Sequence, residues 1–190
     1  MFGEVILMVR GEADETVYLR YIDAASDDDL RTLLERYRDP LTLFLFGFLH
    51  NMEDAEELML DAFAVIASGT AVFSGKSSFK TWLFAIGRNL AYKKLRKNHF
   101  FFVPLDEELT ADSGQPDAEL LKDERSKMLY GAMSMINPEY RQALYLTYFE
   151  DMSADEVADV LKKNRKQVYN LIARGKESLK NRLIEMGFEA

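Results

Sequence analysis

The stretch MSADEVADVLKKNRKQVYNLIARGKESLKNRL, residues 152–183, contains two helical patterns separated by a short polar turn. Ser153 and Glu156 have the spacing of a capping box, which predicts the start of the first helix. Asn164 is placed to cap a second helix directly after a tight turn at residues 162–163. Two short helices joined by such a turn are the sequence outline of a helix-turn-helix.

The second helix has an apolar stripe on one side and polar side chains on the other. With Val168 pointing inward, a helical wheel places basic and amide groups outward, and these groups suit the base edges and phosphates of a DNA major groove. Residues 162–182 contain eight bases and one acid, a net charge of +7 that favours DNA contact over a purely structural helix pair. The predicted contacts are Lys162, Arg165, Lys166, Gln167, Tyr169, Asn170 and Arg174.

The rest of the chain continues the same helical spacing and predicts an all-α fold. The 190 residues include only four prolines and ten glycines, so long segments run without a helix breaker. Apolar residues recur in these segments at helical intervals, with almost no alternating runs. Since 48% of the residues are hydrophobic, the chain has enough apolar surface for a packed core.

Residues 26–99 are predicted to form a bundle of helices. The acid-rich SDDDL at the start of this segment begins one helix, which is expected to end at Tyr37. Pro40 then fits the first position of a second, strongly apolar helix. Asn51 is expected to cap a third helix, and a fourth begins at Phe79 after a loop rich in serine and glycine.

Charge is distributed unevenly over this acidic chain, whose formal net charge is -8. Asp54, Glu57 and Asp61 share one side of the helix after Asn51 and form an acidic strip. Residues 88–99, by contrast, contain five bases and no acid. Basic patches on an acidic body are expected where part of the surface meets a polyanion and the remainder repels it.

Aromatic and basic side chains are interleaved along the helix that begins at Phe79, a mixture suited to gripping a nucleic-acid backbone and stacking unpaired bases. Phe73, in the loop before this helix, is the candidate for stacking. Trp82 and Phe79 lie on the apolar stripe and are expected in the core. The predicted nucleic-acid contacts are Phe73, Lys76, Lys80, Arg88, Asn89, Lys93, Arg96 and Lys97.

The helical spacing ends after His99. Residues 100–120 are rich in acids and contain two prolines, as a linker would. We therefore expect two small helical domains, residues 26–99 and 121–190, joined by an acidic linker and preceded by a weakly patterned N-terminal extension, residues 1–25.

The composition argues against several other classes of protein. Absence of cysteine excludes disulfides and thiolate metal sites. His50 and His99 are the only histidines, and no motif of a metalloprotease, phosphate-binding loop or nucleophile elbow is present. Three acids on one helix supply too few converging oxygens for a metal ion. We expect no enzyme activity, cofactor, metal or small-molecule substrate, and a cytoplasmic location, since the apolar residues 5–9 are too few to span a bilayer.

Three blocks, in this order, resemble the extracytoplasmic-function sigma factors of bacterial RNA polymerase: ERYRDPLTLFLFGFLHNMEDAEELMLDAFAVI, FSGKSSFKTWLFAIGRNLAYKKLRK and INPEYRQALYLTYFEDMSADEVADVL. The resemblance covers about residues 26–99 and 121–187. It implies two helical domains that bind core RNA polymerase and direct promoter-specific initiation without catalysing a reaction.

The resemblance also implies a role for each surface. The helix with DAEELMLDAF corresponds to the part that docks on the β′ clamp helices, through Asp54, Glu57, Leu58 and Asp61. The loop FSGKSS and the basic helix correspond to the part that recognises and melts the promoter −10 element. The helix-turn-helix corresponds to the reader of the −35 element, in a domain that meets the β flap. Family members are often held inactive by an anti-sigma factor, so such a partner is expected.

Several positions depart from the family pattern. Lys162 stands where a turn glycine is common, and a lysine held at positive φ would be strained. Leu60 replaces a usual glutamine, Lys93 replaces a usual aspartate, and residues 167–171 differ from the usual recognition helix. We therefore do not carry over the −35 preference of relatives.

A different reading of the residues is a stand-alone helix-turn-helix regulator of transcription. It explains the C-terminal half of the chain, but it assigns no function to the acidic strip or to the basic helix.

Overall fold

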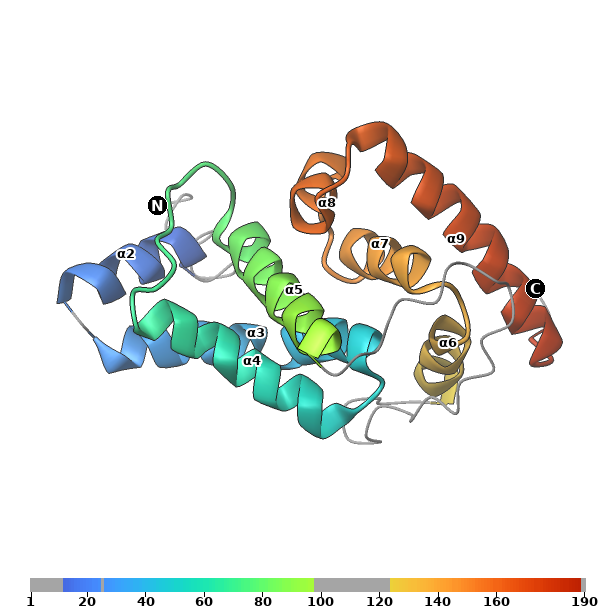
Figure 1. Ribbon diagram of the computed structural model, residues 1–190, viewed down its shortest axis with the longest axis horizontal. Helices are drawn as coiled ribbons and strands as arrows, with labels where there is room; N and C mark the ends of the chain where they lie inside the picture. Colours follow the sequence, from blue (N-terminus) through green and yellow to red (C-terminus); the bar gives the residue numbers. More distant parts are fainter. Residues whose placement is uncertain (1–11, 25, 98–123, 189–190) are drawn as a thin grey trace, which may run out of the picture.

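The computed structural model describes residues 12–24, 26–97 and 124–188, and the described residues form helices and no strand. Two groups of helices lie side by side (Figure 1), which confirms the predicted all-α fold of two helical domains. The predicted linker, residues 100–120, lies outside the described residues. The N-terminal group is α2 (Asp14–Ala24), α3 (Asp27–Leu49), α4 (Met52–Ala67) and α5 (Phe79–Lys97); the C-terminal group is α6 (Glu124–Ser134), α7 (Pro138–Tyr148), α8 (Ala154–Leu161) and α9 (Arg165–Glu185).

Most helix starts follow the predicted caps. The side chains of the predicted caps Asn51, Ser153 and Asn164 each accept a hydrogen bond from a backbone N–H in the first turn of the helix that follows. Asn137 does the same at the start of α7. Ser26 occupies the cap position of α3 without making a side-chain bond. These starts were predictable because a cap depends on residues only two or three positions apart.

α3 runs as one helix through Pro40, so the prediction of two helices separated before this proline is wrong. A proline inside a helix removes one hydrogen bond and costs about 3 kcal/mol. Tertiary packing outweighs that cost, because Leu33 and Leu41, on either side of the proline, are both fully buried. The Tyr145 hydroxyl of α7 also donates a 2.9 Å hydrogen bond to the Pro40 carbonyl.

α2 lies inside the segment that was predicted to be weakly patterned. It contributes only Val17 and Tyr18 to the core, too few residues to produce a visible apolar period. Glu15 links α2 to α5 within the N-terminal domain. Its carboxylate accepts a 2.7 Å hydrogen bond from the Phe79 backbone N–H at the start of α5. The extension thus contains a helix that belongs to the N-terminal core.

The two domains are in direct contact. α5 packs against α8, and α3 packs against α7. No described helix is both long enough and apolar enough to cross a membrane.

Candidate functional site

The acidic strip of α4 lies beside α5 and is partly neutralised by it. The Lys94 ammonium is 2.6 Å from a carboxylate oxygen of Asp54 and 2.6 Å from one of Glu57. Burial by itself lowers the pKa of Lys94, but the hydrogen bonds to these two carboxylates outweigh burial and raise the pKa. Asp61 is exposed, and none of the ion pairs between described residues includes it.

A groove separates the acidic strip from the basic side of α5, so the two surfaces face each other. Leu58 is only 3% exposed and packs in the core beneath this groove, whereas Leu60 on the same helix is 56% exposed. The predicted docking contact at Leu58 stays a prediction. The groove is lined by Glu57, Leu58, Asp61, Leu90, Lys93, Lys94 and Lys97.

The basic stripe of α5 is open to solvent. Asn89, Lys93, Arg96 and Lys97, all predicted nucleic-acid contacts, are exposed. The Arg88 guanidinium lies over the ring of Tyr92, 4.3 Å from the ring centroid. Hydrogen-bond donors and positive charge therefore line the last three turns of the helix.

An aromatic cluster packs around the start of α5. Phe79 is fully buried, which confirms its predicted core position, and the ring of Phe73 lies 5.2 Å from the Trp82 ring and 5.5 Å from the Tyr18 ring. Phe73 is therefore half-buried rather than loose in its loop. Its stacking on an unpaired base stays a prediction. Lys76, in the same loop, is exposed.

α8 and α9 form the predicted helix-turn-helix. Lys162 ends α8 with φ 54° and ψ 45°, so this lysine does occupy the left-handed conformation. Val168 is fully buried, as the helical wheel predicts. Gly175 allows α9 to approach α7 closely, because an added Cβ would lie 3.1 Å from the Leu144 side chain. The turn and the helix crossing thus fix the direction of the outer face of α9.

The outer face of α9 carries the predicted DNA contacts, all of them exposed along with Lys162 in the turn. Two of these side chains already have partners in the chain. The Gln167 amide oxygen closes the capping box of α9, and the Arg165 guanidinium lies 3.5 Å from Asp155 and over the ring of Tyr169. A stripe with four-residue spacing remains open on the helix: Lys166, Asn170 and Arg174.

The contact between α5 and α8 was not predicted. Glu156 Oε1 accepts hydrogen bonds from the hydroxyls of Ser78 at 3.0 Å and Thr81 at 3.1 Å. The Lys80 ammonium lies 3.3 Å from the Glu150 carboxylate. Residues so far apart in the chain leave no local signal in the sequence. Glu156 was already assigned to the capping box of α8, so a contact with α5 was not expected.

The environment of Glu156 acts on its pKa in two directions. Burial by itself raises the pKa, but hydrogen bonds from Ser153, Ser78 and Thr81 outweigh burial and lower it. Glu156 is therefore a carboxylate at neutral pH, which makes the bonds from Ser78 and Thr81 charge-assisted.

Both helical domains match known families. Residues 33–100 match the family model for Sigma-70 region 2, and residues 126–179 match the one for Sigma-70, region 4. The RNA polymerase sigma factor YlaC of Bacillus subtilis (strain 168) is 27% identical over 160 residues, which cover 82% of this chain and 92% of that protein. The ECF RNA polymerase sigma factor SigW of the same strain is 21% identical over 179 residues, covering 88% of this chain and 96% of that protein.

A solved structure shares the fold. The sigma factor RpoE in complex with the anti-sigma factor NepR from Bartonella quintana aligns with a TM-score of 0.61 and 21% sequence identity, covering 82% of this chain and 96% of that chain. Two helical domains in the order of regions 2 and 4, together with these relatives, confirm the predicted family. The chain belongs to the extracytoplasmic-function sigma factors, which direct promoter-specific transcription by bacterial RNA polymerase.

Proposed function

We propose that the acidic strip on α4 docks on the β′ clamp helices of core RNA polymerase. The observation that carries this proposal is the groove between α4 and α5, where an acidic wall faces a basic wall within the region 2 match. Asp61 is the leading contact, because Asp54 and Glu57 already hold Lys94. The adjacent basic wall is then available to DNA that runs past the docked surface.

We propose that α5 and the loop before it bind and melt the −10 element. Unstacking a base costs a few kcal/mol, so a strand that is held by cations and aromatic rings offsets part of that cost. The proposed backbone contacts are those of the exposed stripe, with Lys76, Lys80 and Arg88 nearer the start of the helix. The factor supplies binding alone and makes or breaks no covalent bond, with no cofactor, metal or small-molecule substrate.

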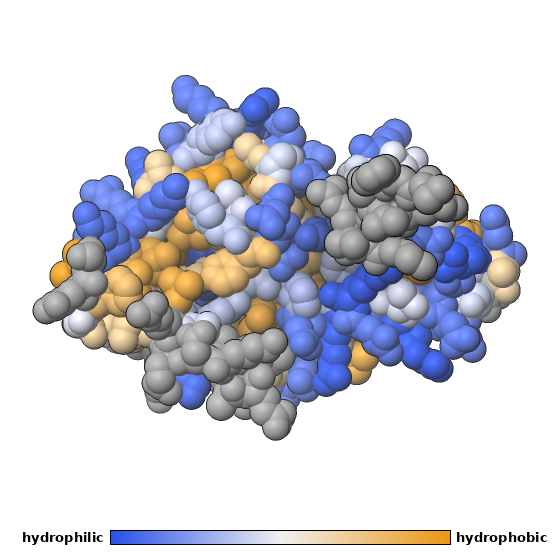
Figure 2. All heavy atoms as spheres, turned by 180° about the vertical axis from the view of Figure 1, so that it is seen from behind, coloured by the Kyte–Doolittle hydropathy of each residue, from blue (hydrophilic) through white to orange (hydrophobic). Residues whose placement is uncertain are grey.

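The C-terminal domain is assigned two partners in this proposal. Lys166, Asn170 and Arg174 read the −35 element in the major groove. Figure 2 shows apolar side chains gathered on the half of the molecule that holds α6 to α9, and a surface of this kind suits the β flap. Exposed apolar side chains in this domain include Met135, Ile184, Met186 and Phe188.

An anti-sigma factor is a further proposed partner. The RpoE structure that shares this fold contains the anti-sigma factor NepR. A protein inhibitor that covers the polymerase-binding or DNA-binding surface would act by competition. We propose that a factor with these partners works in the cytoplasm.

Co-elution with core RNA polymerase on a sizing column, without DNA, tests the docking proposal. We expect stoichiometric co-elution of the wild-type protein and a loss of about tenfold or more in affinity for Asp61→Lys, since a reversed charge in a contact costs more than about 1.4 kcal/mol. Glu56→Lys is the matched control, because Glu56 is exposed on another side of α4. Equal binding by Asp61→Lys and the wild type would contradict the docking surface.

A further inference from the structure

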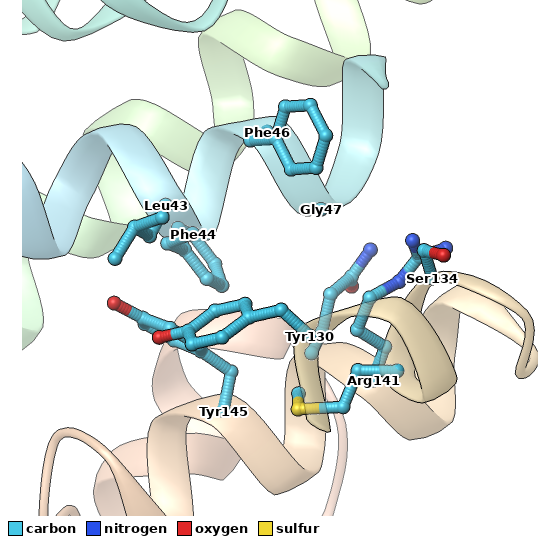
Figure 3. A pocket seen from close by; sticks show the side chains of 10 residues that line it. Leu43, Phe44, Phe46, Gly47, Tyr130, Ser134, Arg141 and Tyr145 are labelled. Carbon is cyan, nitrogen blue, oxygen red and sulfur yellow. The ribbon is translucent and has the colours of Figure 1, made fainter. Parts of the chain in front are cut away.

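A small pocket lies where α3 meets α6 and α7, and Figure 3 shows side chains from α3 facing those of the other two helices. Its volume is about 20 Å³, which is enough for one particle of the size of a water molecule. Much of its wall is apolar, with contributions from Leu43, Phe44, Phe46 and Met133. A charge inside such a pocket is poorly screened by solvent, so it interacts strongly with any opposite charge that enters.

Arg141 brings a positive charge to this pocket. Its side chain lines the pocket, and the residue is only 6% exposed. Burial lowers the pKa of Arg141 to about 10, so the guanidinium stays charged at neutral pH. A neighbouring carboxylate would raise this pKa, but burial is the cause of the shift, and no ion pair joins Arg141 to a described acid. A buried charge of this kind needs a counter-charge.

The nitrogen atoms around this charge lack acceptors. Nε and Nη1 of Arg141 and Nε2 of Gln142, a pocket residue that is 2% exposed, have no hydrogen-bond partner among the described residues. The remaining Arg141 nitrogen, Nη2, lies 3.3 Å from His50 Nε2. Because arginine can only donate, His50 Nε2 accepts this bond and the ring hydrogen lies on Nδ1, which is buried and also without a partner.

Buried donors without acceptors favour an anion over a water molecule. Water brings two hydrogens of its own that need acceptors, whereas a halide ion accepts hydrogen bonds from every direction. The positive charge of Arg141 adds an attraction that water does not have. Phosphate and sulfate groups are larger than one water-sized particle, so the pocket volume excludes them.

We propose that this pocket binds one monoatomic anion of the size of chloride. The anion accepts hydrogen bonds from the Arg141 guanidinium and the Gln142 amide, while His50 holds the guanidinium from the other side. It neutralises the buried charge and thereby stabilises the packing of α7 against the end of α3. This site lies apart from the acidic strip and from the proposed DNA contacts, so the proposal does not depend on the proposed function.

Thermal unfolding in chloride tests the site. Sodium chloride replaces sodium gluconate at constant ionic strength, which keeps the screening of surface charges unchanged. Gluconate is too large for the pocket. Because a ligand that binds only the folded state stabilises it, we expect the melting temperature of the wild type to rise by about 3–5 °C when chloride reaches about ten times its Kd.

Two arginine variants separate this site from general effects of salt. Arg141→Met removes the buried charge and preserves most of the side-chain volume, and we expect no rise with chloride. Arg38→Met is the matched control, because Arg38 is exposed on α3, and it should respond as the wild type does. An equal rise in Arg141→Met, or no rise in the wild type, would overturn the proposal.

Diffraction from crystals of the wild-type protein grown in sodium bromide locates the anion directly. Bromide has the charge of chloride, is only slightly larger, and scatters X-rays anomalously. We expect an anomalous peak within hydrogen-bond distance of the Arg141 guanidinium and the Gln142 amide. Peaks on the surface alone, with none in this pocket, would overturn the proposal even if Arg141→Met does not fold.

Discussion

At the scale of single residues, Lys162 is one of three residues other than glycine that have a positive φ in the described part of the chain. A left-handed conformation costs a residue with a side chain about 1 kcal/mol, and glycine avoids that cost. We expect Lys162→Gly to exceed Lys162→Ala in free energy of unfolding by about 0.5–1 kcal/mol, because both variants lose the same amine but only the glycine relieves the turn. Urea unfolding followed by circular dichroism measures the difference. Equal stabilities would show that the turn is not strained.

At the scale of elements, the first turn of α9 depends on its capping box. The Asn164 side chain accepts a 2.9 Å hydrogen bond from the Gln167 N–H, and the Gln167 side chain accepts a 2.8 Å bond from the Asn164 N–H. We expect Asn164→Ala to lower the free energy of unfolding by about 1 kcal/mol and to speed amide exchange in this turn. Asn164→Ser is the control, since serine also caps helices. A serine variant as unstable as the alanine variant would argue against capping as the cause.

At the scale of the whole molecule, the α3–α7 contact predicts that the stability of the folded protein depends on pH. Burial, and then the positive charge of Arg141, lower the pKa of His50 from 6.5 to about 4. The folded protein therefore keeps His50 neutral while the unfolded chain, with the higher pKa, takes up a proton as the pH falls below 6.5. Acid thus favours unfolding across the window from pH 6.5 to about 4, by up to about 1 kcal/mol at pH 5.5.

Thermal melts at pH 7.5 and pH 5.5 measure this effect. We expect His50→Gln, which does not titrate, to lose less stability between these two values than the wild type. His99, the second histidine, is present in both proteins and cancels in the comparison. An identical pH dependence in the two proteins would rule out His50 as the source.

Local features of the sequence were enough to predict the helix starts and the outward faces. Asn51, Ser153 and Asn164 cap the helices expected of them, and Asn89 and Lys93 face solvent. A cap or a helical face involves residues within about one turn of each other, so the information lies in a short stretch of chain. The continuity of α3 was beyond such reasoning, because burial against distant residues decided it.

By itself, the sequence determined the all-α class, the two domains, the family and the residue types on each functional surface. Only the tertiary structure decided which surfaces meet: the acidic strip with Lys94 of α5, and the start of α5 with Glu150 and Glu156. The physical reason is separation along the chain. Spacing and capping act over a few residues, whereas these ion pairs and hydrogen bonds join residues 37 to 78 positions apart, and only the packing of the helices brings them together.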